Sequence, residues 1–161
     1  MTFEELQELA HREKTDNKRL QHTLLPEITS LLGYAALANI KSIAECGFYC
    51  GHSTIALLRA GYSVTSVDRN YDEYTKTLVS RIYNEYKNFT FIHDEWENVN
   101  ISADMCFLDG DDVPESSFEN YSWLVLDTSP KEPLLSNRWK LVSYTPKLSG
   151  QRLYINTRRV K

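Results

Sequence analysis

The chain has 161 residues, of which 42% are hydrophobic and 25% are charged, and its formal net charge is −4. This is the composition of an ordinary globular domain, and a chain of this length can bury a full core without disulfides or metals. No apolar run approaches the roughly 18 residues that span a bilayer, so we expect no membrane partner.

Cysteine usage bears on the compartment and on metal binding. The chain has three cysteines and a charged N-terminal segment without the apolar stretch of a signal peptide. These features predict reduced thiols in a cytoplasmic protein. Cys46 and Cys50 lie close to His52, but a fourth zinc ligand is missing, and we expect these cysteines to be small buried residues.

The charge is unevenly distributed. All acidic residues precede Asn137, whereas residues 138–161 contain seven basic residues and no acidic one. Such a segment can bind an anionic partner such as a nucleic acid. It can equally be neutralised by the acidic part of the chain or remain solvated, and the sequence leaves these alternatives open.

In chain order, the capping-box pattern Thr2-Phe3-Glu4-Glu5 predicts a first helix. A second helix is predicted from residue 15 or 16, and a third near Pro26. Strands and helices then alternate. Strands are predicted at 42–46, 63–67, 89–92, 103–108 and 123–126, and helices at 53–60 and 72–86. Residues 140–144 and 152–156 predict a closing hairpin.

This alternation predicts an α/β fold with a doubly wound, mainly parallel, seven-stranded Rossmann-like sheet that is covered on both faces and ends in an antiparallel hairpin. We expect one domain over 1–161, with N-terminal helices in 1–39 and the core in 40–161. Only twelve residues run from Gly110 to Tyr121, so the helix of that crossover must be short or irregular.

A glycine loop follows the first predicted strand, in the stretch AECGFYCGHST. Ligands of doubly wound sheets bind at the carboxyl ends of the strands. A phosphate-binding loop would need wider glycine spacing and a lysine where His52 stands, and a dinucleotide fingerprint would need a glycine where Tyr49 stands. A ligand lying against bare backbone and a plain tight turn both remain open.

The segment from Glu45 to Ser53 resembles E-x-G-x-x-x-G-x-S, the first motif of class I S-adenosylmethionine-dependent methyltransferases. Asp68, at the end of the second strand, matches the acidic second motif, which accepts both ribose hydroxyls. Asp94 follows the third strand, where an acid of the family often contacts the adenine amine. Residues 104–112 resemble the F-[IL]-D-G-D-H signature of small-molecule O-methyltransferases, and residues 123–128 resemble their fifth strand.

The resemblance implies S-adenosylmethionine as the cofactor and a small methyl acceptor. An anionic acceptor would connect this activity with the basic residues of 138–161. As a hypothesis about the mechanism, Asp109 or His93 acts as the general base. The implied cofactor-binding residues are Glu45, Gly47, Tyr49, Gly51, Ser53, Asp68, Arg69, Asp94 and Asp109.

The sequence also departs from the family. Asp112 replaces the histidine of the fourth motif, and Thr128 replaces the asparagine that follows the acid Asp127. A Mg²⁺ ion at Asp109 and Asp127 is therefore not expected, although their carboxylates could hold one. The motifs of DNA amino-methylation and cytosine-carbon methylation are absent from the sequence.

Two other classes of function stay open. One is a catalytically silent protein that binds S-adenosylmethionine. The other is a nucleic-acid-binding or protein-binding module that uses residues 138–161. The sequence does not specify the oligomeric state.

Overall fold

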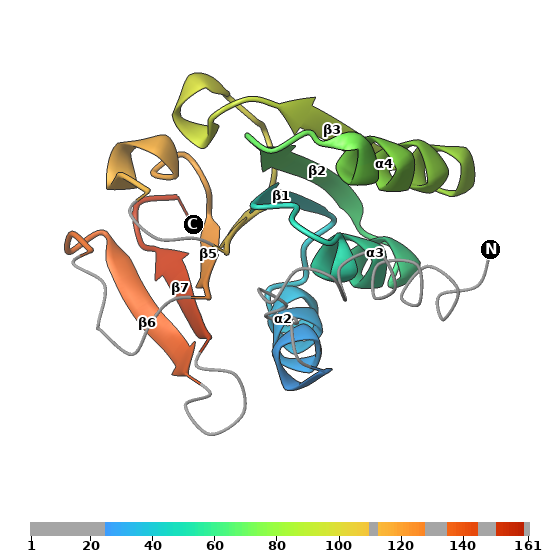
Figure 1. Cartoon of the computed structure of the whole chain (residues 1–161). Coiled ribbons are helices and arrows are strands. Elements are labelled where there is room, and N and C mark those ends of the chain that lie inside the picture. Colours follow the sequence, from blue (N-terminus) through green and yellow to red (C-terminus); the bar gives the residue numbers. More distant parts are fainter. Residues whose placement is uncertain (1–24, 110–112, 128–134, 145–150, 160–161) are drawn as a thin grey trace.

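The computed structural model describes residues 25–109, 113–127, 135–144 and 151–159. Seven strands form one sheet with three helices and two 3-10 turns (Figure 1). The helices are α2 (Leu25–Leu37), α3 (His52–Arg59) and α4 (Glu73–Glu85), and the 3-10 turns are η1 (Trp96–Asn98) and η2 (Glu115–Ser117). The strands are β1 (Ser42–Cys46), β2 (Ser63–Asp68), β3 (Phe89–His93), β4 (Met105–Leu108), β5 (Trp123–Leu126), β6 (Trp139–Tyr144) and β7 (Arg152–Asn156). The helices predicted at Thr2 and near residue 15 lie outside the described residues.

The strand order is β3-β2-β1-β4-β5-β7-β6. The first five strands pair in parallel, whereas β7 runs antiparallel to both β5 and β6. This arrangement confirms the predicted mainly parallel sheet with its closing hairpin. The chain reverses its direction of winding between β1 and β4, and ligands of doubly wound sheets bind beyond the carboxyl ends of such strands.

The two faces of the sheet are covered differently. On one face lie α2, α3 and α4 (Figure 1). Their buried residues form one apolar cluster with side chains of the sheet such as Ile43 and Phe107. On the other face, Trp96 of η1, Phe118 after η2 and Trp139 of β6 pack over residues such as Leu124. The described part of the chain thus covers its second face with aromatic side chains and 3-10 turns. The expectation of a short or irregular crossover between β4 and β5 is confirmed.

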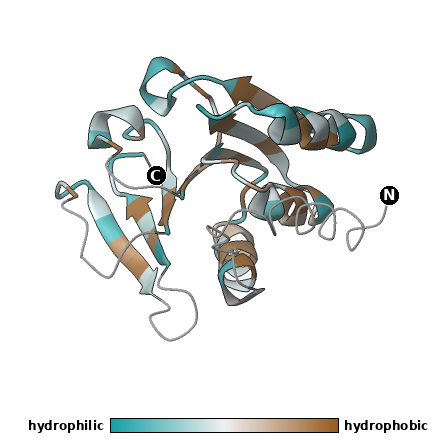
Figure 2. Ribbon diagram, in the orientation of Figure 1, coloured by the Kyte–Doolittle hydropathy of each residue, from teal (hydrophilic) through white to brown (hydrophobic). Residues whose placement is uncertain are grey.

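Local signals explain where the helices next to the site begin and end. The carboxylate of Asp72 caps α4 by accepting a hydrogen bond of 2.8 Å from the backbone N–H of Thr75. Gly51 precedes α3 in a left-handed conformation, with φ of 68°, and Gly61 follows it with φ of 94°. Hydrophobic residues run along the central strands, and the exposed side of α4 is hydrophilic (Figure 2). The ends of α3 and α4 lie within one residue of the predicted ranges 53–60 and 72–86.

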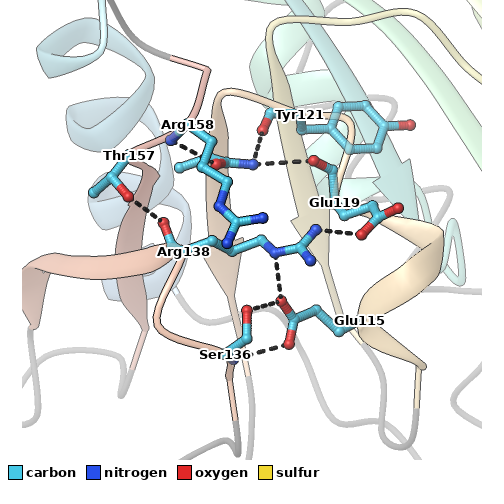
Figure 3. A network of polar contacts seen from close by, with 8 residues as sticks. Glu115, Glu119, Tyr121, Ser136, Arg138, Thr157 and Arg158 are labelled. Atoms are coloured by element: carbon cyan, nitrogen blue, oxygen red, sulfur yellow. Dashed lines mark hydrogen bonds and ion pairs between the residues drawn. The ribbon is translucent and has the colours of Figure 1, made fainter.

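A polar network joins the C-terminal hairpin to η2 (Figure 3). The guanidinium of Arg138 lies between two carboxylates: it bonds to Glu119, and its Nε lies 3.5 Å from an oxygen of Glu115. Ser136 donates to the same Glu115 from its backbone N–H and its hydroxyl. At the same end of the hairpin, Asn156 pairs with Trp139, and its side-chain amide donates to the backbone carbonyl oxygen of Glu119 over 3.0 Å. The basic segment is thus partly neutralised by acidic residues of the body.

We expect Arg138→Met to lower the free energy of unfolding by about 1–2 kcal/mol, since two carboxylates lose a charged hydrogen-bonding partner that is only a quarter exposed. Urea unfolding measures this effect, which should shrink in 1 M salt because salt screens ion pairs. Lys140→Met is the matched control, because Lys140 is an exposed residue of β6 two positions after Arg138. An equal loss in both variants would contradict a specific role for this network.

Candidate functional site

The glycine loop lies at the carboxyl end of β1 and is shaped by the chain itself. Gly47 has φ of 95°, and a Cβ added there would lie 2.6 Å from the carbonyl oxygen of Asp109. A Cβ added at Gly51 would lie 2.9 Å from the buried ring of Phe48. Both glycines are therefore required by neighbouring parts of the fold, whether or not a ligand also approaches them.

Asp68 holds this loop from the end of β2. Its Oδ2 accepts hydrogen bonds from the backbone N–H groups of Phe48, at 3.0 Å, and Tyr49, at 2.9 Å. Its Oδ1 accepts one from Asn70 at 2.8 Å. A carboxylate offers about four acceptor positions, so capacity remains for a further donor. The structure thus brings Asp68 and the loop together, while the side chain of Tyr49 is 42% exposed beside them.

Glu45 and Ser53 lie beneath the loop, between the sheet and α3. The carboxylate of Glu45 is completely buried and accepts hydrogen bonds from the hydroxyls of Ser53, Thr54 and Ser66. Burial raises the pKa of Glu45, and these three hydrogen bonds lower it in part. Sequence reasoning named Glu45 and Ser53 but missed Thr54 and Ser66, whose hydroxyls within otherwise apolar elements were the available signal.

Arg69, His93 and Asp94 lie at the ends of β2 and β3 and are exposed. Nε2 of His93 lies 3.1 Å from the carbonyl oxygen of Arg69, and its ring lies 5.1 Å from that of Tyr71. Oδ1 of Asp94 accepts bonds from the side-chain amide of Asn98 and a backbone N–H, which lower the pKa of Asp94. Asp94 therefore also organises η1.

Asp109 and Asp127 follow the neighbouring strands β4 and β5. The backbone N–H of Asp109 donates to Cys46, and that of Asp127 donates to Leu108. The carboxylate of Asp127 accepts a 3.0 Å bond from Gln151, and burial raises its pKa. Within the described ranges, no three His, Cys, Asp or Glu side chains gather in a way that could hold a metal ion. Asp111 and Asp112 lie outside those ranges.

Because β3 and β4 are separated by β2 and β1, three strand spacings of about 4.8 Å divide His93 from Asp109. The structure therefore does not bring the two predicted bases together. Asp68, the glycine loop and Asp109 do form one continuous group along the ends of β2, β1 and β4.

The basic segment does not form one uniform surface. Arg138 is paired, Arg159 donates to Asn120, and Arg152 is buried. Sequence reasoning missed the burial of Arg152, because basic side chains are almost always exposed. A nucleic-acid interface stays a prediction, and among the described basic residues it rests mainly on Lys140 and Arg158.

The described helices are too short or too polar to cross a membrane. No family sequence model matches the chain, and no curated protein sequence matches it at a significant level.

Solved structures match it closely in fold. A Staphylococcus aureus protein assigned as a caffeoyl-CoA O-methyltransferase is similar with a TM-score of 0.71 and 16% identity, over 97% of this chain and 92% of that chain. A Klebsiella pneumoniae protein assigned as an O-methyltransferase is similar with a TM-score of 0.69 and 15% identity, over 96% and 89%. A Podospora anserina methyltransferase bound to S-adenosylhomocysteine is similar with a TM-score of 0.63 and 14% identity, over 95% and 86%. The chain thus has the fold of these methyltransferases, which confirms the predicted fold.

Proposed function

We propose that this chain is an S-adenosylmethionine-dependent methyltransferase that acts on a small, anionic acceptor. The observation that carries the proposal is the contact between Asp68 and the glycine loop at the carboxyl edge of a sheet ordered β3-β2-β1-β4-β5-β7-β6. The fold shared with a methyltransferase bound to S-adenosylhomocysteine supports it.

The residues present fit this cofactor. The carboxylate of Asp68 retains acceptor capacity for ribose hydroxyls, and the exposed Tyr49 lies beside it. Gly47, Gly51 and Asp94 would border the cofactor, with Arg69 on the side of β3. Glu45 and Ser53 would act from beneath, by fixing the loop to α3.

When bound, the cofactor supplies a methyl group that is already activated on a sulfonium. The main task of the chain is then to align the acceptor, and such positioning can lower a barrier by about 7–11 kcal/mol. Asp109 is the proposed base, because it follows the strand next to the glycine loop; a base can add roughly 10²–10⁴-fold. His93 lies on the far side of that loop and is the weaker candidate.

The test is calorimetric titration with S-adenosylmethionine and S-adenosylhomocysteine, with and without Mg²⁺. We expect Asp68→Ala to weaken binding of both compounds roughly 100-fold, because hydrogen bonds to a charged group are lost. The matched control is Asp104→Ala. Asp104 also accepts two backbone N–H groups, from Lys41 and Ser42, but at the opposite edge of the sheet.

Normal binding by Asp68→Ala, or equal weakening in both variants, would show that the cofactor does not bind at this edge. Absence of binding to the folded wild-type protein would refute the cofactor itself.

A second candidate is a protein that binds the cofactor without catalysis. It is favoured by the connections from β3 to β4 and from β4 to β5, whose described residues form only 3-10 turns and so offer little scaffold for an acceptor. Cofactor binding without methyl transfer to any acceptor tested would support it.

A further inference from the structure

Arg152 occupies a distinctive place at the site edge of the sheet. It is the first residue of β7, and its backbone pairs with Leu126, the last residue of β5, and with Tyr144, the last residue of β6. Because β7 is antiparallel to β5, its first residue lies at the carboxyl ends of the parallel strands. Arg152 therefore shares an edge with the glycine loop and with Asp109.

The guanidinium of Arg152 is buried without the partners that such a group needs. The residue is 5% exposed, and its Nη1 has no hydrogen-bond partner. Its Cζ lies 4.4 Å from the centre of the Tyr144 ring, a cation–π contact that leaves Nη1 without an acceptor. In the part of the chain that the structure describes, no carboxylate pairs with this side chain.

Arg138 provides a comparison. It directly precedes β6 and is more exposed, and its Nε also lacks a hydrogen-bond partner. Arg138 nevertheless bonds to the carboxylate of Glu119 and approaches that of Glu115, whereas Arg152 has neither kind of contact among the described residues. Burying a guanidinium with unsatisfied donors destabilises a fold, and an apolar side chain of similar volume would fit such a place at lower cost. The arrangement is therefore explained best by a ligand that brings its own acceptors.

We infer that Arg152 binds the anionic group, a carboxylate or a phosphate, of the methyl acceptor. The planar guanidinium matches both groups with two parallel hydrogen bonds. The inference rests on the proposed methyl transfer, since it assigns the substrate class of the same site. β4 and β7 are two strand spacings apart, about 10 Å, so one small molecule can reach both Asp109 and Arg152.

The experiment measures thermal unfolding and anion titration with sodium phosphate and sodium benzoate, against sodium chloride of equal ionic strength. The proteins are the wild type, Arg152→Met and the control Lys140→Met, which removes an exposed cation from the same hairpin. We expect phosphate or benzoate to raise the Tm of the wild type and the control. Arg152→Met should bind that anion roughly 10- to 100-fold more weakly. Phosphate alone would indicate a phosphorylated acceptor, and benzoate alone a carboxylated one.

A second readout separates binding from a structural role. In chloride alone, Arg152→Met should be at least as stable as the wild type, because it removes a buried charge. A Tm lower by several degrees would mean that the fold already satisfies Arg152, and would overturn the inference. So would an equal anion effect in Arg152→Met and the wild type, or no effect of either anion on the wild type. If Arg152→Met does not fold, Arg152→Lys replaces it and should bind the anion about tenfold more weakly; unchanged binding would overturn the inference.

S-adenosylhomocysteine is titrated into the same proteins. Binding in all of them, combined with loss of the anion effect in Arg152→Met alone, supports both proposals. If the anion effect depends on Arg152 but S-adenosylhomocysteine does not bind, the anion site stands and the methyl-transfer proposal fails. If S-adenosylhomocysteine binds but the anion effect does not depend on Arg152, only the role of Arg152 is refuted.

Discussion

Gly47→Ala is expected to lower the free energy of unfolding by about 2–4 kcal/mol and to abolish binding of S-adenosylmethionine. The left-handed backbone at Gly47, with φ of 95°, costs a non-glycine residue about 1–3 kcal/mol. The added Cβ would also lie 2.6 Å from the carbonyl oxygen of Asp109. That oxygen belongs to the backbone directly after β4, so it cannot move away without disturbing the β1–β4 pairing. Such forced shifts cost about 1–3 kcal/mol.

Two other glycines separate the contributions. Gly61 has φ of 94°, but an added Cβ would have no atom within 4 Å, so Gly61→Ala should show the backbone strain alone. Gly33 lies inside α2 with open space around it, and Gly33→Ala should stabilise the fold by about 0.5–1 kcal/mol. Urea unfolding of the three variants measures the series. If Gly61→Ala lowers the free energy of unfolding as much as Gly47→Ala does, the close approach of Asp109 to Gly47 does not contribute to the effect.

The strands were predictable because each buried strand is a short apolar run between polar residues. The predicted bounds of β5 and β7 are those observed. The strand predicted at 103–108 begins only at Met105, because Asp104 bonds to the backbone of Lys41 and Ser42. That contact joins residues about sixty positions apart, which no local pattern reveals.

The sequence also did not predict how the second face of the sheet is covered, because this too depends on contacts between distant residues. Trp96, Phe118 and Trp139 come from three separate segments and meet only in the folded chain. Their spacing in the sequence has no helical period, so it carries no signal of a shared role.

The candidate site also has one part that the sequence predicts and another that only the folded chain reveals. Asp68 and the glycine loop could be predicted, because Asp68 ends β2 and the loop directly follows β1, and the carboxyl ends of both strands face the site. The close approach of Asp109 to Gly47 and the burial of Arg152 could not, because both depend on pairing between distant strands. Composition assigned Arg152 to a basic surface, and only the register of β7 places it at the site edge.

Glu45→Ala is expected to lower the free energy of unfolding by about 3–5 kcal/mol at neutral pH. The buried hydroxyls of Ser53, Thr54 and Ser66 all donate to this carboxylate and would lose their common acceptor. The truncation also leaves a cavity between β1 and α3. Glu45→Gln should cost much less, because its amide oxygen can accept from Thr54 and Ser66 while its NH2 group donates to the hydroxyl of Ser53, which can reverse its direction.

The pH dependence of stability gives a second test of this buried carboxyl. Burial raises the pKa of Glu45 above its ordinary value of 4.5, and hydrogen bonds from Ser53, Ser66 and Thr54 offset part of the rise. The folded protein therefore retains a proton that the unfolded chain releases near pH 4.5. Stability from this group is complete below that pH and is lost as the pH rises through the raised pKa, by up to about 1.4 kcal/mol per pH unit.

Unfolding in urea from pH 4.5 to 8 measures this decline. Glu45→Gln should remove the part of the slope that Glu45 causes. Asp127→Asn is the matched control, because burial also raises the pKa of Asp127, so it should remove a separate contribution. A Glu45→Gln variant with the full wild-type slope would contradict the protonated form of Glu45. Glu45→Gln should still bind S-adenosylhomocysteine. The role of Glu45 beneath the loop is to hold Ser53 and α3 in place, and a neutral amide can also do this.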